Sequence, residues 1–142
     1  EGCVEEARRC LGRPYTLDGR VVHGQQIGRR IGFPTANMKL DEPCKVIPRN
    51  GVYAVTAQVG DSPVMRGIMN IGTRPTFHGE ERTLETNIFD ELDDFYGNHM
   101  HVQFISHLRD EQQFASGEVL AEQIRIDKEE AKKRLIAYEQ ES

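Results

Sequence analysis

Residues 51–71 read GVYAVTAQVGDSPVMRGIMNI, and this stretch decides the fold class. Two runs rich in β-branched and apolar residues, Gly51–Val59 and Val64–Ile71, flank the sequence GDSP at residues 60–63. β-Branched side chains favour strands, and a short loop of Gly, Asp, Ser and Pro favours a hairpin. The stretch therefore predicts two neighbouring antiparallel strands.

Further strand-like runs lie on both sides of this hairpin. They cover Tyr15–His23, Thr83–Phe89 and His99–His107, and Gly and Pro punctuate the segments between them. Successive strands with turn signals and no intervening helices predict a small antiparallel barrel or sandwich. We expect five or six strands in a mainly β domain.

The pattern becomes helical after His107. Ser116 is expected to cap a first helix, and Asp127, followed three residues later by Glu130, is expected to open a second one. The second helix places Leu135 on an apolar stripe. We therefore expect C-terminal helices packed against the barrel.

Composition bounds the possible functions. The chain has 142 residues, 37% of them hydrophobic and 29% charged, with a net charge of −5 and a pI of about 5.5. Residues 1–50 carry nine Lys and Arg against six Asp and Glu, and residues 51–142 carry nine against seventeen, so the two parts hold +3 and −8. Broad binding to a nucleic-acid backbone is not expected, although the basic part suits a small anion. No apolar run approaches the roughly 20 residues that cross a membrane.

The cysteines and the first residues bear on the cellular location of the chain and on whether it is a piece of a longer protein. Cys3, Cys10 and Cys44 form no C-x-x-C motif, so neither a disulfide framework nor a zinc site is indicated, and a reducing, cytoplasmic location is expected. Residues Val4–Leu11 predict a short amphipathic helix that ends before Pro14. Because the chain opens at Glu1 without Met, we expect a piece of a longer protein.

A glycine-rich segment holds the densest chemical signal. Gly24, Gly28 and Gly32 recur at four-residue intervals beside Arg29 and Arg30. Backbone N–H groups in such a loop can approach a phosphate closely, and arginines pair with its oxygens. A flexible loop with solvated arginines is the alternative.

Two oxygen-bearing side chains follow that loop. Thr35 and Asn37 lie two residues apart, so they share one face of an extended segment, and hard oxygen ligands suit Mg²⁺. Neither a Walker A loop nor a dinucleotide-binding glycine fingerprint occurs in the chain. The nearest match to a Walker A loop, residues 67–74, is interpreted as a strand followed by a turn.

The segment LETNI at residues 84–88 supplies a candidate base. In a strand Glu85 and Asn87 share one face, while Leu84, Thr86 and Ile88 share the other. A carboxylate beside MgATP can accept the proton of a substrate hydroxyl. An ordinary glutamate on a solvated strand face is the alternative.

Two further sets of residues have simpler interpretations. Arg109 and Phe114 could bracket a flat ligand, although spacing alone favours a salt-bridged turn whose Phe fills the core. His99 and His101 lie at strand period, but no third ligand accompanies them in the sequence, so a pair of surface histidines is favoured.

Several motifs together resemble the riboflavin kinase family, in particular the C-terminal kinase domain of bacterial bifunctional riboflavin kinase/FMN adenylyltransferases (FAD synthetases). The resemblance covers about residues 12–135 and rests on GRVVHGQQIGRRIGFPTAN (19–37), NGVYAV (50–55), NIGTRPTF (70–77), LETNIFD (84–90), DFYG (94–97) and LRDEQQF (108–114). It implies a six-stranded antiparallel Greek-key barrel with C-terminal helices. It also implies transfer of the γ-phosphoryl group of MgATP to the ribityl 5′-hydroxyl of riboflavin, which yields FMN and ADP.

The resemblance also implies roles for individual residues. Glu85 matches the catalytic base, and Thr35 and Asn37 match the ligands of Mg²⁺ and phosphate. The remaining positions match the loop around the ATP phosphates and the flavin site: Gly24, Gly28 and Arg29 for the former, and Glu85, Asn87, Arg109 and Phe114 for the latter.

The resemblance divides the chain into two parts. Residues 1–11 are expected to be a linker helix from an N-terminal nucleotidyltransferase domain that this chain lacks, and residues 12–142 the kinase domain. Such a chain would make FMN but no FAD. Two other functions stay open from the residues: a flavin- or nucleotide-binding module without turnover, and an oligonucleotide-binding barrel, which the net charge of −5 disfavours.

Overall fold

The computed structural model describes residues 15–22, 36–41, 47–61, 63–77, 79–89, 98–111 and 116–141. Their six strands close into a barrel in the order β1-β2-β5-β4-β3-β6, and every neighbouring pair is antiparallel. The elements are β1 (Tyr15–Val22), β2 (Ala36–Leu40), β3 (Gly51–Val59), β4 (Met65–Thr76), β5 (Gly79–Ile88), β6 (His99–Arg109) and α3 (Gly117–Glu141).

The strand order confirms the predicted Greek-key barrel. Strands β3, β4 and β5 follow one another as hairpins, and β6 returns beside β3, which is the defining arrangement of a Greek key. The hairpin predicted from residues 51–71 is present, with Ala57 opposite Met65 and Gly51 opposite Ile71. The segment of Asn37, predicted only to be extended, forms β2.

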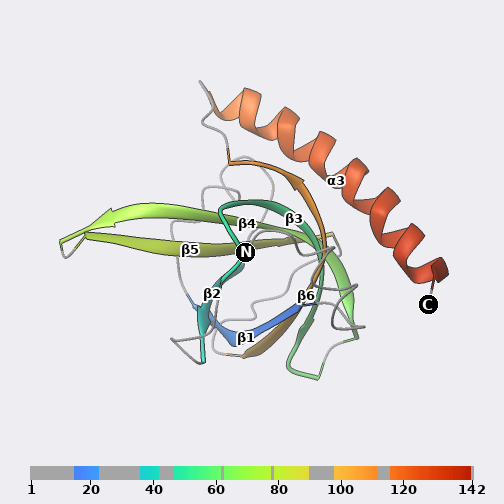
Figure 1. Cartoon of the computed structure of the whole chain (residues 1–142), viewed down its shortest axis with the longest axis horizontal. Helices are drawn as coiled ribbons and strands as arrows, with labels where there is room; N and C mark the ends of the chain where they lie inside the picture. Colours follow the sequence, from blue (N-terminus) through green and yellow to red (C-terminus); the bar gives the residue numbers. More distant parts are fainter. Residues whose placement is uncertain are drawn as a thin grey trace.

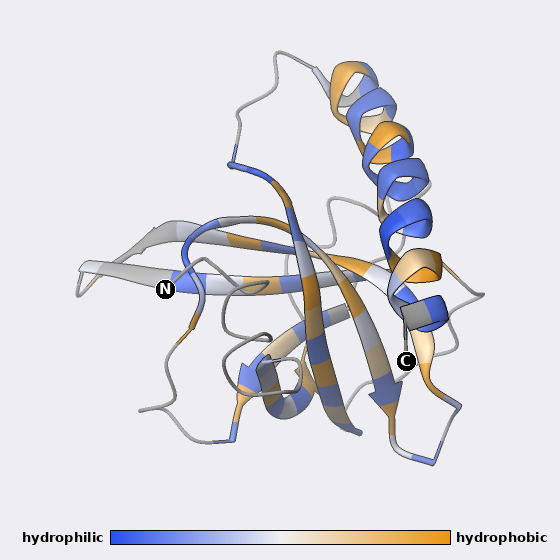
Figure 2. Cartoon of the chain, turned by 45° about the vertical axis from the view of Figure 1, so that its right-hand side comes forward, coloured by the Kyte–Doolittle hydropathy of each residue, from blue (hydrophilic) through white to orange (hydrophobic). Residues whose placement is uncertain are grey.

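The barrel interior is filled by alternate side chains of all six strands. Tyr53 and Phe104 lie at its centre, fully buried, with their rings in an edge-to-face contact at 5.3 Å. The alternation of apolar and polar residues is visible along the strands in Figure 2. Thr86 is also fully buried inside the barrel, which confirms that it shares the inner face with Leu84 and Ile88.

The hairpin of β4 and β5 is longer than the sequence predicted. The turn expected after Ile71 is wrong: β4 continues through Gly72 to Thr76, and the chain reverses only at Phe77. Gly and Pro within this segment suggest a turn, but both strands pair along its whole length. The hairpin therefore projects beyond the barrel, to the left in Figure 1.

The predicted helix break at Asp127 is also wrong. Residues Gly117–Glu141 form one continuous helix, which Ser116 caps through its hydroxyl on the N–H of Val119 at 3.3 Å. Asp127 lies in mid-helix, 4% exposed, where its carboxylate accepts hydrogen bonds from Arg109. A partly buried arginine partner thus replaces the capping role that the local sequence suggested.

Helix α3 covers one side of the barrel, on the right in Figure 1. Ala131 and Leu135 pack on the outer faces of β3, β4 and β6, where they bury Val52, Ala54, Ile68 and Ile105. The first seven residues of β3 are consequently buried on both faces.

Two arginines also tie α3 to the strands. Arg134 donates to the Ser106 hydroxyl and the His107 carbonyl, both at 2.7 Å, and Arg66 makes a bidentate pair with Glu139. No helix among the described residues is long and apolar enough to cross a membrane. The linker helix predicted at residues 4–11 lies outside the described residues.

Candidate active site on the outer face of the barrel

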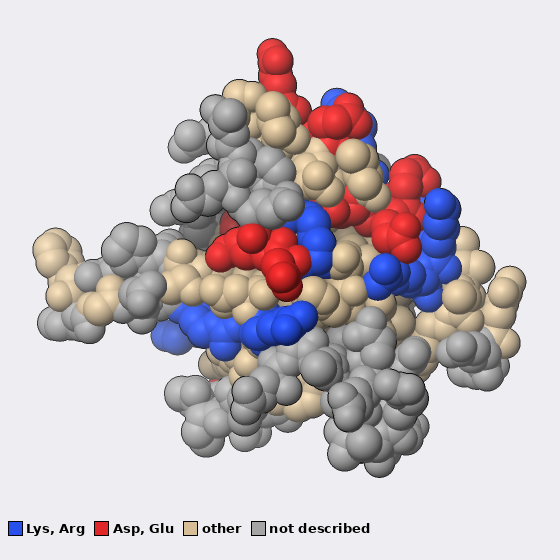
Figure 3. Space-filling model, turned by 45° about the horizontal axis from the view of Figure 1, so that its top comes forward, with Lys and Arg blue, Asp and Glu red and all other residues tan. Residues whose placement is uncertain are grey.

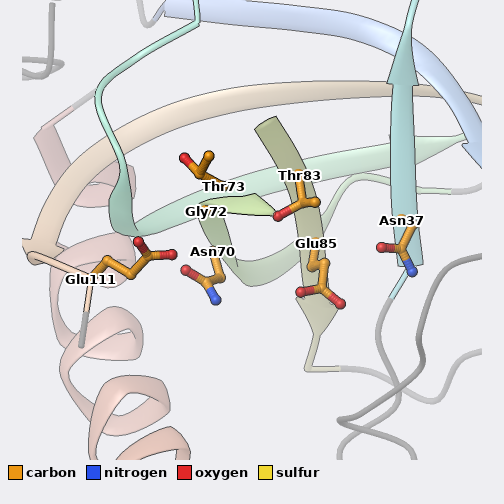
Figure 4. Close-up of a pocket in the computed structure, with 7 residues that line it drawn as sticks. All are labelled: Asn37, Asn70, Gly72, Thr73, Thr83, Glu85 and Glu111. Carbon is orange, nitrogen blue, oxygen red and sulfur yellow. The ribbon is translucent and has the colours of Figure 1, made fainter. Parts of the chain in front are cut away.

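A polar hollow lies on the outside of the barrel, at the base of the long hairpin. It has a volume of about 190 Å³, and Figure 4 shows its lining side chains. They come from β2, β4, β5 and the residues after β6, and they are Asn37, Asn70, Gly72, Thr73, Thr83, Glu85 and Glu111.

Glu85 lies between two amides at the centre of this lining. The register of the sheet places Glu85 directly opposite Asn37 on one side and directly opposite Asn70 on the other. Directly opposed residues have Cβ atoms about 5 Å apart and project to the same side of the sheet. The inner neighbours Met38 and Met69 are buried, so this row of an amide, a carboxylate and an amide faces outward.

Glu111 forms the opposite wall of the hollow. Its carboxylate lies so close to Gly72 that a Cβ added at Gly72 would collide with Glu111 Oε2. In Figure 4 the Glu111 carboxylate points inward, toward Gly72 and Asn70. The glycine therefore leaves the room that a second carboxylate occupies.

A hydrogen-bond network fixes the base of the hairpin beside the hollow. Asn50 Nδ2 donates to Thr73 Oγ1 at 2.7 Å, and Arg82 Nη2 donates to Asn50 Oδ1 at 2.9 Å. Arg82 also donates to the carbonyl of Ile47 at 3.2 Å and to that of Pro48. Residues 47–50 are thus anchored to β4 and β5, and the hydroxyl of Thr73 has a fixed position.

Asn87 lies on the outer face with Glu85, as strand alternation predicted, but it is not part of the lining. It is buried opposite Ile68, on the side of the barrel that α3 covers. The amide next to Glu85 is instead Asn70, which the sequence analysis did not select.

Arg109 is engaged with the helix. Its guanidinium donates to both carboxylate oxygens of Asp127, with the shortest contact at 2.9 Å, and its side chain is 18% exposed. The sequence favoured a salt-bridged turn at this point, whereas the structure pairs Arg109 with a carboxylate of helix α3, eighteen residues later in the chain. Its predicted contact with a flavin is not tested, and Phe114 lies outside the described residues.

Four other predicted site residues also lie outside the described residues. They are Gly24, Gly28, Arg29 and Thr35. The predicted phosphate loop and one predicted metal ligand therefore stay predictions. Asn37 and Glu85 are the predicted residues that the structure brings together.

The donor set of the hollow fits a hard cation. It offers carboxylate, amide and hydroxyl oxygens, which suit Mg²⁺, an ion that typically takes one or two protein ligands together with substrate phosphates. Elsewhere His101 lies 2.6 Å from Asp18, and His99 lies 3.5 Å from Asp18 and from Asp41. Among the described residues, no group of three or more His, Cys, Asp or Glu is arranged to hold a metal.

Surface charge is mixed around α3. On the face drawn in Figure 3, acidic and basic side chains of the described residues adjoin one another. Arg66 with Glu139 and Arg125 with Glu122 are such pairs.

A single signal would have revealed the missed residues of strands β4 and β5. Once Thr76 is placed opposite Gly79, antiparallel pairing sets Asn70 opposite Glu85 and Gly72 opposite Thr83. The turn predicted from the sequence comes too early to give this register. Glu111 follows β6 and reaches the hollow through tertiary packing alone.

Comparisons with known proteins agree with this architecture. The family model described as riboflavin kinase matches residues 11–135. The bifunctional riboflavin kinase/FMN adenylyltransferase of Haemophilus influenzae is 42% identical over 129 residues, which are 91% of this chain and 41% of the relative. The chain thus spans about two fifths of the length of that relative.

Two solved structures share the fold. The riboflavin kinase of Trypanosoma brucei superposes with a TM-score of 0.63 at 27% identity and covers 87% of this chain and 80% of its own. A structure titled macrolide-efflux protein, from Streptococcus pneumoniae, reaches 0.87 at 38% identity and covers 93% of this chain and 43% of its own. The barrel topology and the outward row of Asn37, Glu85 and Asn70 agree with a family match that covers most of the sequence. The chain therefore belongs to the riboflavin kinase family.

Proposed function

We propose that this chain is a riboflavin kinase, which transfers the γ-phosphoryl group of ATP to the ribityl 5′-hydroxyl of riboflavin and releases FMN and ADP. The observation that carries the proposal is Glu85, held between Asn37 and Asn70 in an open polar hollow, in a chain of this family. A bond forms between the 5′-oxygen and the γ-phosphorus as the bond from that phosphorus to the bridging oxygen of ADP breaks.

Glu85 acts as the general base. Its carboxylate accepts the proton of the 5′-hydroxyl as the oxygen attacks, and it orients that hydroxyl for in-line displacement. Flanking amides suit this role because their N–H groups can hold a carboxylate or a substrate hydroxyl in place without adding charge. Phosphoryl transfer depends mainly on such positioning and on neutralisation of charge.

Asn37, with Thr35, would hold a divalent cation such as Mg²⁺. The fit rests on the carboxylate, amide and hydroxyl oxygens of the hollow beside Glu85. When bound, the cation would neutralise charge on the phosphates. Gly24, Gly28 and Arg29 are proposed to surround those phosphates, and they lie outside the described residues.

The flavin side of the site is proposed to lie toward the end of β6. Arg109, Phe114 and Asn87 keep this proposed role from the family resemblance. The position of Arg109, two residues before the pocket residue Glu111, supports a flavin near this wall.

The FMN adenylyltransferase activity named for the relatives is proposed to belong to a different domain. We propose that residues 12–142 are the kinase domain and residues 1–11 a linker. In the full-length protein a covalently linked adenylyltransferase domain, which acts in the cytoplasm with the kinase, would make FAD. The support is that the chain covers 41% of its relative from Haemophilus influenzae, which is named for both activities.

The test is direct. Purified chain is incubated with riboflavin, ATP and MgCl₂, and the flavins are separated by chromatography, with and without EDTA. We expect FMN and ADP in equal amounts, no FAD, and no product with EDTA. Riboflavin that binds without forming FMN would instead indicate a flavin-binding module, and salt-sensitive binding of an oligonucleotide would indicate a nucleic-acid-binding barrel.

A further inference from the structure

A partly buried ion pair connects helix α3 to the end of β6. Arg109 Nε lies 3.0 and 3.1 Å from the two carboxylate oxygens of Asp127, and its Nη2 lies 2.9 Å from Asp127 Oδ2. The side chains are 18% and 5% exposed, respectively. Gln123 Nε2, one helical turn earlier, donates to Asp127 Oδ1 at 3.0 Å. The carboxylate of Asp127 is therefore fixed by two partners.

The same guanidinium also holds the chain that leads into the pocket. Arg109 Nη1 donates to the carbonyl oxygen of Asp110 at 3.1 Å. The next residue is Glu111, whose carboxylate lies against Gly72 and forms one wall of the hollow. Asp127 is thus linked to Glu111 in three steps: the ion pair with Arg109, the hydrogen bond from Arg109 to the Asp110 carbonyl, and the peptide bond that follows.

Helix α3 is a firm base for this series. Leu135 and Ala131 are fully buried against the barrel, and Arg134 binds the Ser106 hydroxyl and the His107 carbonyl on β6. Because the helix is fixed by these contacts, Asp127 can hold Arg109 in one place. Asp110 itself is exposed, and its carboxylate lies 3.4 Å from His107 Nε2 and 3.7 Å from Arg49 Nη2.

We propose that Asp127 is a positioning residue that holds Glu111 in the pocket wall through Arg109, and that this wall binds the hydroxyl groups of the substrate's polyol chain. The proposal rests on the proposed riboflavin kinase function. A carboxylate accepts hydrogen bonds from hydroxyl groups and repels phosphates, so Glu111 suits the ribityl chain and not the nucleotide. Glu85 and Glu111 then face the same chain from two sides of Asn70.

The first test compares two carboxylates of α3 that pair with barrel arginines. Asp127→Asn weakens the pair that leads to the pocket, whereas the control Glu139→Gln weakens the bidentate pair with Arg66 near the other end of the helix. For Asp127→Asn we expect the KM and the Kd of riboflavin to rise about tenfold, the effect of one lost charge-assisted hydrogen bond. The KM of MgATP should stay within about twofold, and Glu139→Gln should change neither constant.

A second variant displaces Glu111 without touching the helix. In Gly72→Ala the new methyl group would occupy the position of the Glu111 carboxylate. We expect the same selective rise in the riboflavin constants. Because both changes act through Glu111, the riboflavin constants of the double variant should rise no further than those of the more impaired single variant. Independent effects would multiply instead. All variants are compared at a temperature where circular dichroism shows them folded.

The outcomes separate the two proposals. If the parent chain forms FMN and Asp127→Asn binds riboflavin as tightly as the parent, the positioning role is wrong and the kinase function stands. Equal losses for riboflavin and MgATP, or multiplicative losses in the double variant, would also overturn it, since a merely structural role predicts them. A parent chain that forms no FMN overturns both proposals.

Discussion

The outer face of strand β4 changes character between two neighbouring positions. Ile68 is buried beneath Leu135 and Ala131 of α3, whereas Asn70, two residues later on the same face, is exposed and lines the hollow. Strand β5 shows the same change from buried Asn87 to half-buried Glu85. The helix thus covers one part of the barrel surface and leaves the adjoining part open.

This difference separates stability from function. The covered region buries apolar side chains, which stabilise the fold in proportion to the area removed from water. The open region carries a carboxylate and amides that contribute little to packing and can act on a ligand. Substitutions in the open region should therefore change activity without changing stability, and substitutions in the covered region should do the reverse.

The largest expected effect is that of Glu85→Gln in the open region. Loss of a general base should reduce kcat by about 10²- to 10⁴-fold. The free energy of unfolding should change by less than about 0.5 kcal/mol, because the side chain is not part of the core. FMN formation and urea unfolding measure the two quantities, and Glu122→Gln on the exposed face of α3 is the control. Unchanged turnover would remove Glu85 from the catalytic role.

Leu135→Ala in the covered region should have the opposite profile. The fully buried side chain packs between α3 and the barrel, so its truncation should cost about 2–5 kcal/mol of unfolding free energy. Below the unfolding transition kcat and the KM of MgATP should match those of the parent chain. A large change in kcat for the folded variant would show that the two regions are not separable.

Asn37→Ala tests the metal side of the open region. Removal of one oxygen donor should raise the Mg²⁺ concentration needed for half-maximal activity about tenfold, with unfolding unchanged. Titration of activity with MgCl₂ measures this shift, and the exposed Asn98→Ala is the control. An identical titration curve for Asn37→Ala would exclude Asn37 as a ligand.

Thr86→Val should stabilise the barrel interior. Thr86 Oγ1 is buried, and among the described residues it has no hydrogen-bond partner. Replacement of an unsatisfied hydroxyl by a methyl group of similar size should add about 1 kcal/mol to the free energy of unfolding. The matched change Thr56→Val should instead destabilise, since the Thr56 hydroxyl lies 3.2 Å from Gln103 Oε1. Denaturant unfolding of both variants decides the sign.

The smallest expected effect is on the pH dependence of the free energy of unfolding, through the exposed pair of Arg66 and Glu139 at the edge of the covered region. The hydrogen bonds from Arg66 lower the pKa of Glu139 below its ordinary value of 4.5. A carboxyl whose pKa is lower when folded stabilises the fold above the unfolded pKa, and this contribution is lost as the pH falls through the folded pKa. The pair is exposed, so parent and Glu139→Gln should differ by less than about 1 kcal/mol at pH 7 and converge in acid.

Two errors of sequence interpretation have clear physical causes. Gly72 and Pro75 suggested a turn, yet β4 continues because β5 pairs with it throughout. Asp127 resembled a helix cap, yet its carboxylate is satisfied by Arg109, eighteen positions earlier in the chain. Both cues are local, and in each case a contact with a distant residue outweighed them.

The sequence by itself determined the succession of strands, the common face of Glu85 and Asn87, and the family, because alternation and motif content are properties of consecutive residues. Only the tertiary structure decided which side chains adjoin Glu85. Asn37 and Asn70 reach it through the register of three strands, and Glu111 through the close approach permitted by Gly72. Register and packing depend on how the barrel closes, so residues far apart in the chain meet only in the folded protein.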